Sequence, residues 1–95
     1  MTETFQSSRE EISRAVLIQK IETKLSEALG GRNVASLLLY VTIRAIPGHP
    51  NWRISAGDGV PPAVIGPLLN VVGRLQQKFN LSPSEHAELL KAQGT

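Results

Sequence analysis

Apolar residues recur at helical spacing in the first third of the chain. One stripe of them, typical of the buried face of a helix, consists of Leu17, Ile18, Ile21, Leu25, Ala28 and Leu29. We therefore predict a helix over residues 8–29, capped by Ser7 or Ser8 and ended by the two glycines that follow it. A second helix stripe consists of Ile12, Ala15 and Val16. This second helix stripe either packs against another part of the chain, such as the last helix, or forms a subunit interface.

A period of two replaces the helical spacing in the next segment. Residues 34–46 alternate apolar and polar side chains in their second half, which predicts a strand, while residues 34–38 fit either a strand or a helical turn. After a loop with two prolines and a glycine, residues 52–56 alternate again, so we predict a hairpin. A shift by two residues would keep the same two faces and stays open. The favoured register makes one face wholly apolar and pairs Ala45 with Trp52, Ile43 with Ile54, and Val41 with Ala56.

The other face of this hairpin is polar. We call it the polar hairpin face, and it consists of Tyr40, Thr42, Arg44, Arg53 and Ser55. Arg44 and Arg53 lie directly opposite in the favoured register, and like charges so placed destabilise a sheet unless an anion is near. The face is therefore solvated with diverging arginines, or an interface with a protein, or a surface for nucleic acid. Nucleic-acid stacking surfaces need several aromatic residues, and this chain has one Trp, one Tyr and two Phe, which disfavours the third alternative.

A helix with an irregular start follows the hairpin. Its buried stripe consists of Val64, Leu68, Val71, Val72, Leu75 and Phe79. Pro67 inside a running helix would clash with the preceding turn. We therefore predict a short turn over residues 62–65 and a main helix over residues 67–79 that begins at this proline.

The last element is a second helix after the hairpin, over residues 83–92. Ser82 is its predicted cap, a proline occupies its first turn, and Glu85 completes a capping box. Residues 1–7 and 93–95 are expected to fray.

These elements define the fold class. The order α-β-β-α-α predicts a single α+β domain. It consists of an N-terminal helix, an antiparallel hairpin and two C-terminal helices, with the helices packed on one face of the small sheet. An isolated hairpin is marginally stable in water. Either the helices cover it completely, or a second copy adds strands at its edge, and we expect a homodimer of the second kind.

Composition narrows the chemistry further. The 95 residues include 10 Lys+Arg and 8 Asp+Glu, a net charge of +2, without the basic run of a dedicated nucleic-acid binder. No cysteine is present, which excludes disulfides, thiolate nucleophiles and cysteine-ligated zinc. The polar start is unlike a signal peptide, and the longest apolar run is far shorter than the roughly 20 residues that span a bilayer. We expect a cytoplasmic protein without cofactors and without membrane contact.

Catalytic groupings are sparse. Gly57-Asp58-Gly59 lacks the spacing of a phosphate-binding loop, so we interpret Asp58 as a turn residue. His49 in a loop and His86 on a helix are both expected to be exposed, and they lack the spacing of metal ligands. An enzyme would need Asp58 and His49 to converge in one pocket. We predict no catalytic residue and no metal site.

Two short motifs resemble a known group of proteins. Asn51-Trp52 opens a strand after a Gly/Pro loop, and the main helix ends in Leu75-Gln76-Gln77-Lys78-Phe79-Asn80-Leu81. This pattern is similar to that of small uncharacterised bacterial proteins with a helix, a hairpin with an Asn-Trp step, and a helix ending Leu-Gln-x-x-aromatic-x-Leu. The resemblance covers about residues 8–81, and the helix after Leu81 departs from it. It implies an α+β fold and no known activity.

The leading functional hypothesis is a small interaction module without catalytic activity that forms a homodimer and could also bind another protein. Its expected contact surfaces are the polar hairpin face and the second helix stripe. The alternative hypothesis is weak binding of nucleic acid or another anion through Arg44, Arg53 and Tyr40, with a steep dependence on salt.

Overall fold

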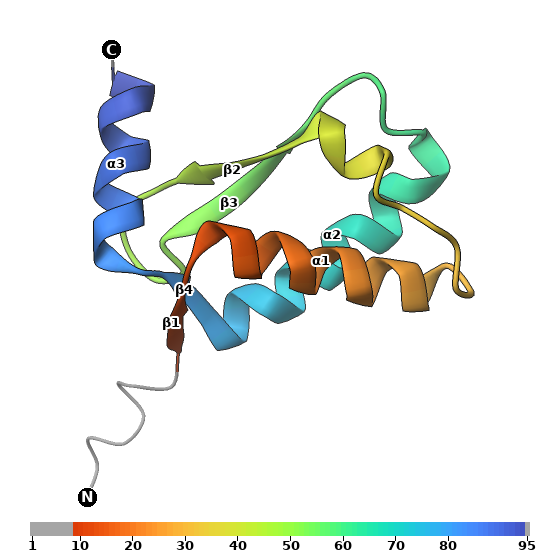
Figure 1. Cartoon of the computed structure of the whole chain (residues 1–95), viewed down its shortest axis with the longest axis horizontal. Helices are drawn as coiled ribbons and strands as arrows, with labels where there is room; N and C mark the ends of the chain where they lie inside the picture. The colour runs from red at the N-terminus through yellow and green to blue at the C-terminus, as the bar shows by residue number, and fades with distance from the viewer. Residues whose placement is uncertain (1–8, 95) are drawn as a thin grey trace, which may run out of the picture.

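The computed structural model describes residues 9–94 and has the predicted α+β class. Figure 1 shows the elements along the chain. Their bounds are β1 (Glu10–Ile12), α1 (Arg14–Ala28), the 3-10 helix η2 (Leu37–Tyr40), β2 (Val41–Ala45), β3 (Trp52–Ala56), α2 (Pro62–Lys78), β4 (Phe79–Leu81) and α3 (Pro83–Gly94).

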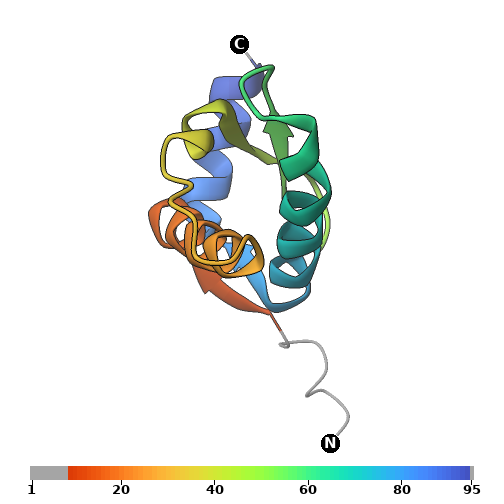
Figure 2. The ribbon, with the colours of Figure 1, turned by 90° about the vertical axis from the view of Figure 1, so that its right-hand side faces the viewer.

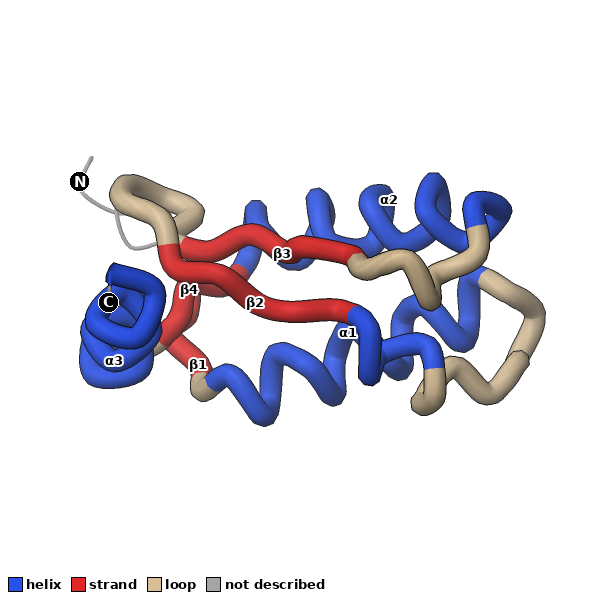
Figure 3. The backbone as a smooth tube through the Cα atoms, turned by 90° about the horizontal axis from the view of Figure 1, so that it is seen from above, coloured by secondary structure: helices blue, strands red, loops and turns tan. Residues whose placement is uncertain are grey.

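The hairpin of β2 and β3 packs over a pair of antiparallel helices, α1 and α2. Seen from above, the two strands run between these helices, and α3 stands across the end of the hairpin beside β2 (Figure 3). Figure 2 shows α1, α2 and the hairpin surrounding one interior. That interior is filled by apolar side chains from all three, among them Leu17, Ile21, Leu25, Ile43, Trp52, Leu68, Val72 and Leu75.

The hairpin has the predicted register. Ala45 pairs with Trp52, and Arg44 pairs with Arg53. Main-chain hydrogen bonds close both ends of the ladder, from Ile46 N–H to the Asn51 carbonyl (3.0 Å) and, beyond the other end, from Gly57 N–H to the Tyr40 carbonyl (2.7 Å). The predicted strand over residues 34–46 was too long, because η2 takes the residues before Val41 and the helical-turn alternative applies there.

The start of the first helix was predicted wrongly. Ser13 is its cap, and its Oγ accepts a hydrogen bond from Val16 N–H (3.2 Å). The residues before this cap form β1, which pairs in parallel with β4, Ile12 facing Leu81. Ser7 and Ser8, the predicted caps, lie outside the described residues.

The last two helices also differ from prediction. α2 runs without a break from Pro62 through Pro67, so the predicted separation of a short turn over residues 62–65 from a main helix that begins at Pro67 is wrong. Pro67 lies near the start of α2, where it removes only the bond to the Ala63 carbonyl, and Ala63 is exposed so that water can replace it. α3 continues to Gly94 rather than fraying after residue 92, and its Gln93 side chain is bonded to β2.

Candidate functional site

The polar hairpin face forms as the register requires. Arg53, Thr42 and Ser55 are exposed, and Arg44 is half-buried. Neither arginine forms an ion pair with any acidic residue in the part of the chain that the structure describes. The Tyr40 ring lies against Gly59, where an added Cβ would come within 2.5 Å of ring carbons. The face therefore carries two adjacent cations without a local counter-charge.

One edge of the hairpin is closed by the chain itself. Ala45 N–H donates to Gln93 Oε1 (2.7 Å), and Gln93 Nε2 donates to the Ala45 carbonyl (3.1 Å). This pair of bonds imitates a neighbouring strand at the outer edge of β2. Because α3 packs beside it, β2 is the covered edge (Figure 3).

The other edge, along β3, is open. The alternation of the antiparallel ladder turns the N–H and C=O groups of Trp52, Ile54 and Ala56 away from β2. Gln76 Nε2 donates to the Trp52 carbonyl (2.8 Å). The outward groups of Ile54 and Ala56 have no hydrogen-bond partner within residues 9–94. This leaves a short free strand edge, which is a site for pairing with another strand.

An exposed apolar side chain lies on the helix face that borders this edge. Ile65, Leu69 and Gln76 share one side of α2, since they are separated by whole turns of the helix. Gln76 reaches β3, so this side of α2 runs along the open edge. Leu69 is 56% exposed there, and Ile65 is half-buried against the core.

The second helix stripe does not form as predicted. Ile12 belongs to β1 rather than α1, is only 9% exposed and packs in the core. Ala15 and Val16 lie on α1 and are exposed. The first turn of α3 contacts the start of α1, because Arg14 N–H donates to Glu85 Oε1 (2.7 Å). For Ile12, the alternative that another part of the chain covers it therefore applies, rather than a subunit interface.

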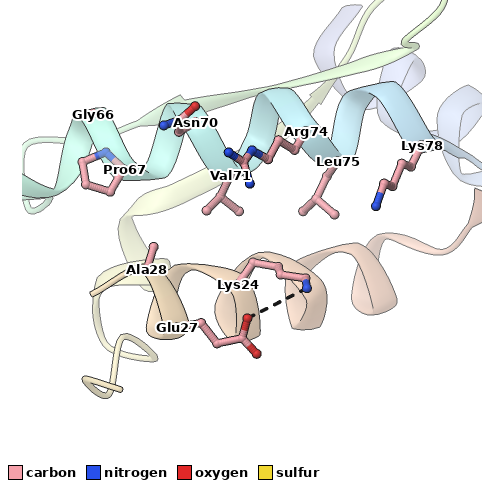
Figure 4. A pocket seen from close by; sticks show the side chains of 10 residues that line it. All are labelled: Lys24, Glu27, Ala28, Gly66, Pro67, Asn70, Val71, Arg74, Leu75 and Lys78. Atoms are coloured by element: carbon pink, nitrogen blue, oxygen red, sulfur yellow. Dashed lines mark ion pairs between the residues drawn. The ribbon is translucent and has the colours of Figure 1, made fainter. Parts of the chain in front are cut away.

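A groove that the sequence did not reveal runs between α1 and α2 (Figure 4). It joins a hollow of about 850 Å³ to a smaller one of about 410 Å³, which share Lys24, Leu75 and Lys78. We call it the basic groove, because four cations and one acid line it: Lys20, Lys24, Arg74, Lys78 and Glu27.

The basic groove combines charge with an apolar base. Val71 and Leu75 form its base, and Val16 and Phe79 line one end. The single acid, Glu27, is 3.9 Å from Lys24 in an exposed ion pair. The sequence held a partial signal, the spacing of four residues within each cationic pair, but only the packing of α1 against α2 brings the two pairs together.

A buried polar cluster ties β3 to β4 and was also missed. Asn51 Oδ1 accepts from Leu81 N–H (2.8 Å), and Asn51 Nδ2 donates to the Leu81 carbonyl (3.1 Å). Trp52 Nε1 donates to the Phe79 carbonyl (3.0 Å). Asn80 Oδ1 accepts from Asn51 N–H (3.2 Å). The Asn-Trp step and the end of α2, the two motifs that carry the resemblance, therefore hold each other in place.

The titratable candidates do not assemble into a catalytic centre. Asp58 and His49 lie at opposite ends of β3, so the catalytic pairing considered for them does not form (Figure 1). His49 is exposed as expected and contacts Asn80 Nδ2 through Nδ1 (2.9 Å). His86 was expected to be exposed but is half-buried, because its Nε2 donates to the Ile46 carbonyl (2.8 Å).

Within residues 9–94, no three His, Cys, Asp or Glu side chains are grouped so that they could hold a metal ion. No helix in that range has the length and apolar character needed to cross a bilayer.

Comparison with protein-family models, with curated proteins and with solved structures gives no match to this chain. Three surfaces of the molecule itself remain as candidates for function: the open β3 edge, the polar hairpin face and the basic groove.

Proposed function

We propose that this chain is a non-catalytic interaction module that self-associates through the open edge of β3. The observation that carries the proposal is the asymmetry of the hairpin. On β2, Gln93 bonds to Ala45, α3 packs alongside, and the outward-bonding residues Ile43 and Ala45 are only 3% and 4% exposed. On β3, Ile54 is half-buried, Ala56 is exposed, and their outward main-chain groups have no hydrogen-bond partner within residues 9–94. Pairing two copies would bury this edge and leave a covered β2 edge on each side of a four-stranded sheet.

A two-fold symmetric register supports this arrangement. With Ile54 opposite Ile54 of the second copy, Trp52 meets Ala56, and Arg53 meets Ser55. Trp52 is fully buried and its carbonyl already accepts from Gln76 Nε2, so the accessible part of this edge is Ile54 and Ala56, and the pair of Trp52 with Ala56 forms only if Gln76 moves aside. The register separates the two Arg53 side chains, so it avoids placing like charges opposite each other. Leu69, 56% exposed beside this edge, would be covered in the same contact.

Light scattering after size exclusion tests the proposal. At concentrations from low micromolar to submillimolar, and at two salt levels, we expect a mass rising from one chain of 10.3 kDa towards twice that value. Ala56→Pro removes one outward N–H without touching the ladder to β2, and Leu69→Glu charges the neighbouring surface. Both variants should weaken dimerisation, whereas Leu90→Glu, at a residue 42% exposed on α3, should not.

The outcomes separate the two parts of the proposal. A wild-type chain that stays monomeric at every concentration refutes self-association. A dimer whose stability is unchanged by both Ala56→Pro and Leu69→Glu refutes the β3 edge while leaving self-association intact.

The unpaired arginines favour a second candidate function, the binding of an anion at the polar hairpin face. Arg44 and Arg53 lie opposite each other without a described counter-charge. Binding of an oligonucleotide at this face should fall steeply as salt rises and should be lost in Arg44→Glu. Binding that survives this substitution would exclude the face.

A further inference from the structure

We infer that the basic groove takes an acidic amphipathic helix of another protein. This inference goes beyond self-association and uses a different surface. The β3 edge borders the side of α2 that carries Leu69, whereas the groove lies between α2 and α1 (Figure 4).

The shape of the groove selects an elongated occupant. Its lining residues extend along α2 from Gly66 to Lys78 and on to Phe79 at the start of β4, over three turns of helix. At 1.5 Å per residue this is about 20 Å, which is longer than a single bound ion or a small anion would occupy. Along the other wall the groove follows α1 from Val16 to Ala28.

The charges are arranged in two rows along this length. Lys20 and Lys24 lie one turn apart on α1, and Arg74 and Lys78 lie one turn apart on α2. In Figure 4, Lys24, Arg74 and Lys78 project from the two helices at the groove. Glu27 is exposed, and among residues 9–94 its carboxylate has only the weak pair with Lys24, so the net charge of the lining is strongly positive.

Between the two rows the base is apolar. Val71 and Leu75 close the bottom, and Val16 and Phe79 continue it at one end. An occupant that matches this surface needs an apolar stripe with carboxylates on both of its flanks. An amphipathic helix has that pattern, with apolar residues three and four positions apart and acids on either side.

Other anions match the groove less well. A single-stranded nucleic acid requires exposed rings on which its bases stack, but Phe79 is half-buried and has Lys20 Nζ 4.9 Å from its ring centroid. A lipid carries its charge at one end, whereas the cations here are spread along both walls.

The test uses a synthetic peptide as the probe. A fluorescein-labelled helix of about 20 residues carries leucines along one stripe and glutamates on both flanks, a length sufficient for appreciable helix content. Fluorescence anisotropy should show saturable binding to the full-length chain. Two control peptides replace the glutamates with glutamine or the leucines with serine, and both should bind more weakly. Equal binding of either control peptide would overturn the inference.

Charge reversal at the groove provides the matched comparison. Arg74→Glu combined with Lys78→Glu should weaken binding about tenfold, and Lys20→Glu combined with Lys24→Glu on the other wall should act alike. Arg32→Glu combined with Lys91→Glu, at two exposed residues outside the groove and outside the hairpin, gives the same change in net charge and should have little effect. A peptide with lysine flanks should bind the reversed groove better than it binds the wild type.

Three further results would overturn the inference. The first is unchanged affinity in both groove variants, with circular dichroism and Trp52 fluorescence showing that they fold. The second is equal weakening in the Arg32→Glu, Lys91→Glu control, which would assign the binding to net charge. The third is tighter binding of oligo(dT) that competes with the peptide, which would assign the groove to nucleic acid.

Discussion

Replacing Asn51 with alanine tests the tie between the hairpin and β4. The Asn51 side chain lies beside Leu81, on the side that faces away from β1. Its Oδ1 accepts from Leu81 N–H, and its Nδ2 donates to the Leu81 carbonyl. Leu81 is 1% exposed, so water does not reach these groups in the native structure. Asn51→Ala therefore leaves one buried donor and one buried acceptor without partners.

The expected cost follows from these two groups. An unsatisfied buried polar group costs about 1–3 kcal/mol, so two of them set a range of about 2–6 kcal/mol. Water that enters the space vacated by the side chain lowers the cost, and we expect a loss of about 3 kcal/mol. A domain of 95 residues has a free energy of unfolding of about 5–14 kcal/mol, so the variant should still fold, with a much smaller free energy of unfolding.

Urea unfolding followed by the fluorescence of the single tryptophan, Trp52, measures this loss. Asn70→Ala is the matched control, because Asn70 is exposed on α2 and has no hydrogen-bonding side-chain contact within residues 9–94. It should change stability by no more than about 0.5 kcal/mol, in the stabilising direction. The reasoning would be refuted if Asn51→Ala lowered the free energy of unfolding by less than about 1 kcal/mol while the dependence of that free energy on urea concentration stayed the same.

Three further changes test other contacts. Trp52→Ala removes a fully buried indole and should cost about 3–5 kcal/mol, leaving little folded protein, and a near-normal cooperative melt would contradict this. Gln93→Ala removes two bonds to the β2 edge and should increase association beyond a dimer in light scattering, and an unchanged mass would contradict the covering role of Gln93. Arg53→Thr relieves the pair with Arg44 and should raise stability by about 0.2–1 kcal/mol, and a lower melting temperature would count against the like-charge argument.

The hairpin was predictable because its information is local. Alternation over β2 and β3 assigns every side chain to a face, and the apolar face is complete in the register that pairs Ile43 with Ile54. The polar hairpin face then followed without further information. By contrast, β1 and β4 are three residues each, too short for a period to show, and each is a strand only because the other lies beside it.

The two surfaces that carry the proposals needed tertiary information. Whether an edge is open depends on what covers it, and nothing in the pattern of α3 indicates that Gln93 bonds to Ala45. The basic groove exists because Lys24 and Arg74, on helices distant in sequence, come to line one cavity. The prediction of the second helix stripe was wrong for the same reason, since Ile12 lies in β1 and pairs with β4 instead of belonging to the helix.

The pairing of β1 with β4 has a consequence for the order of folding. Nearly the whole described chain separates these strands, and Arg9 Nε donates to the Gln76 carbonyl 67 positions later (2.7 Å). Contacts between residues this far apart in the sequence form slowly, because the loop between them must lose conformational entropy first. During synthesis, α1 and the hairpin therefore exist before β1 has a partner, and Ile12 is buried only when Phe79–Leu81 has been made. The strands β1 and β4 can therefore pair only after the hairpin and both α1 and α2 have been synthesised.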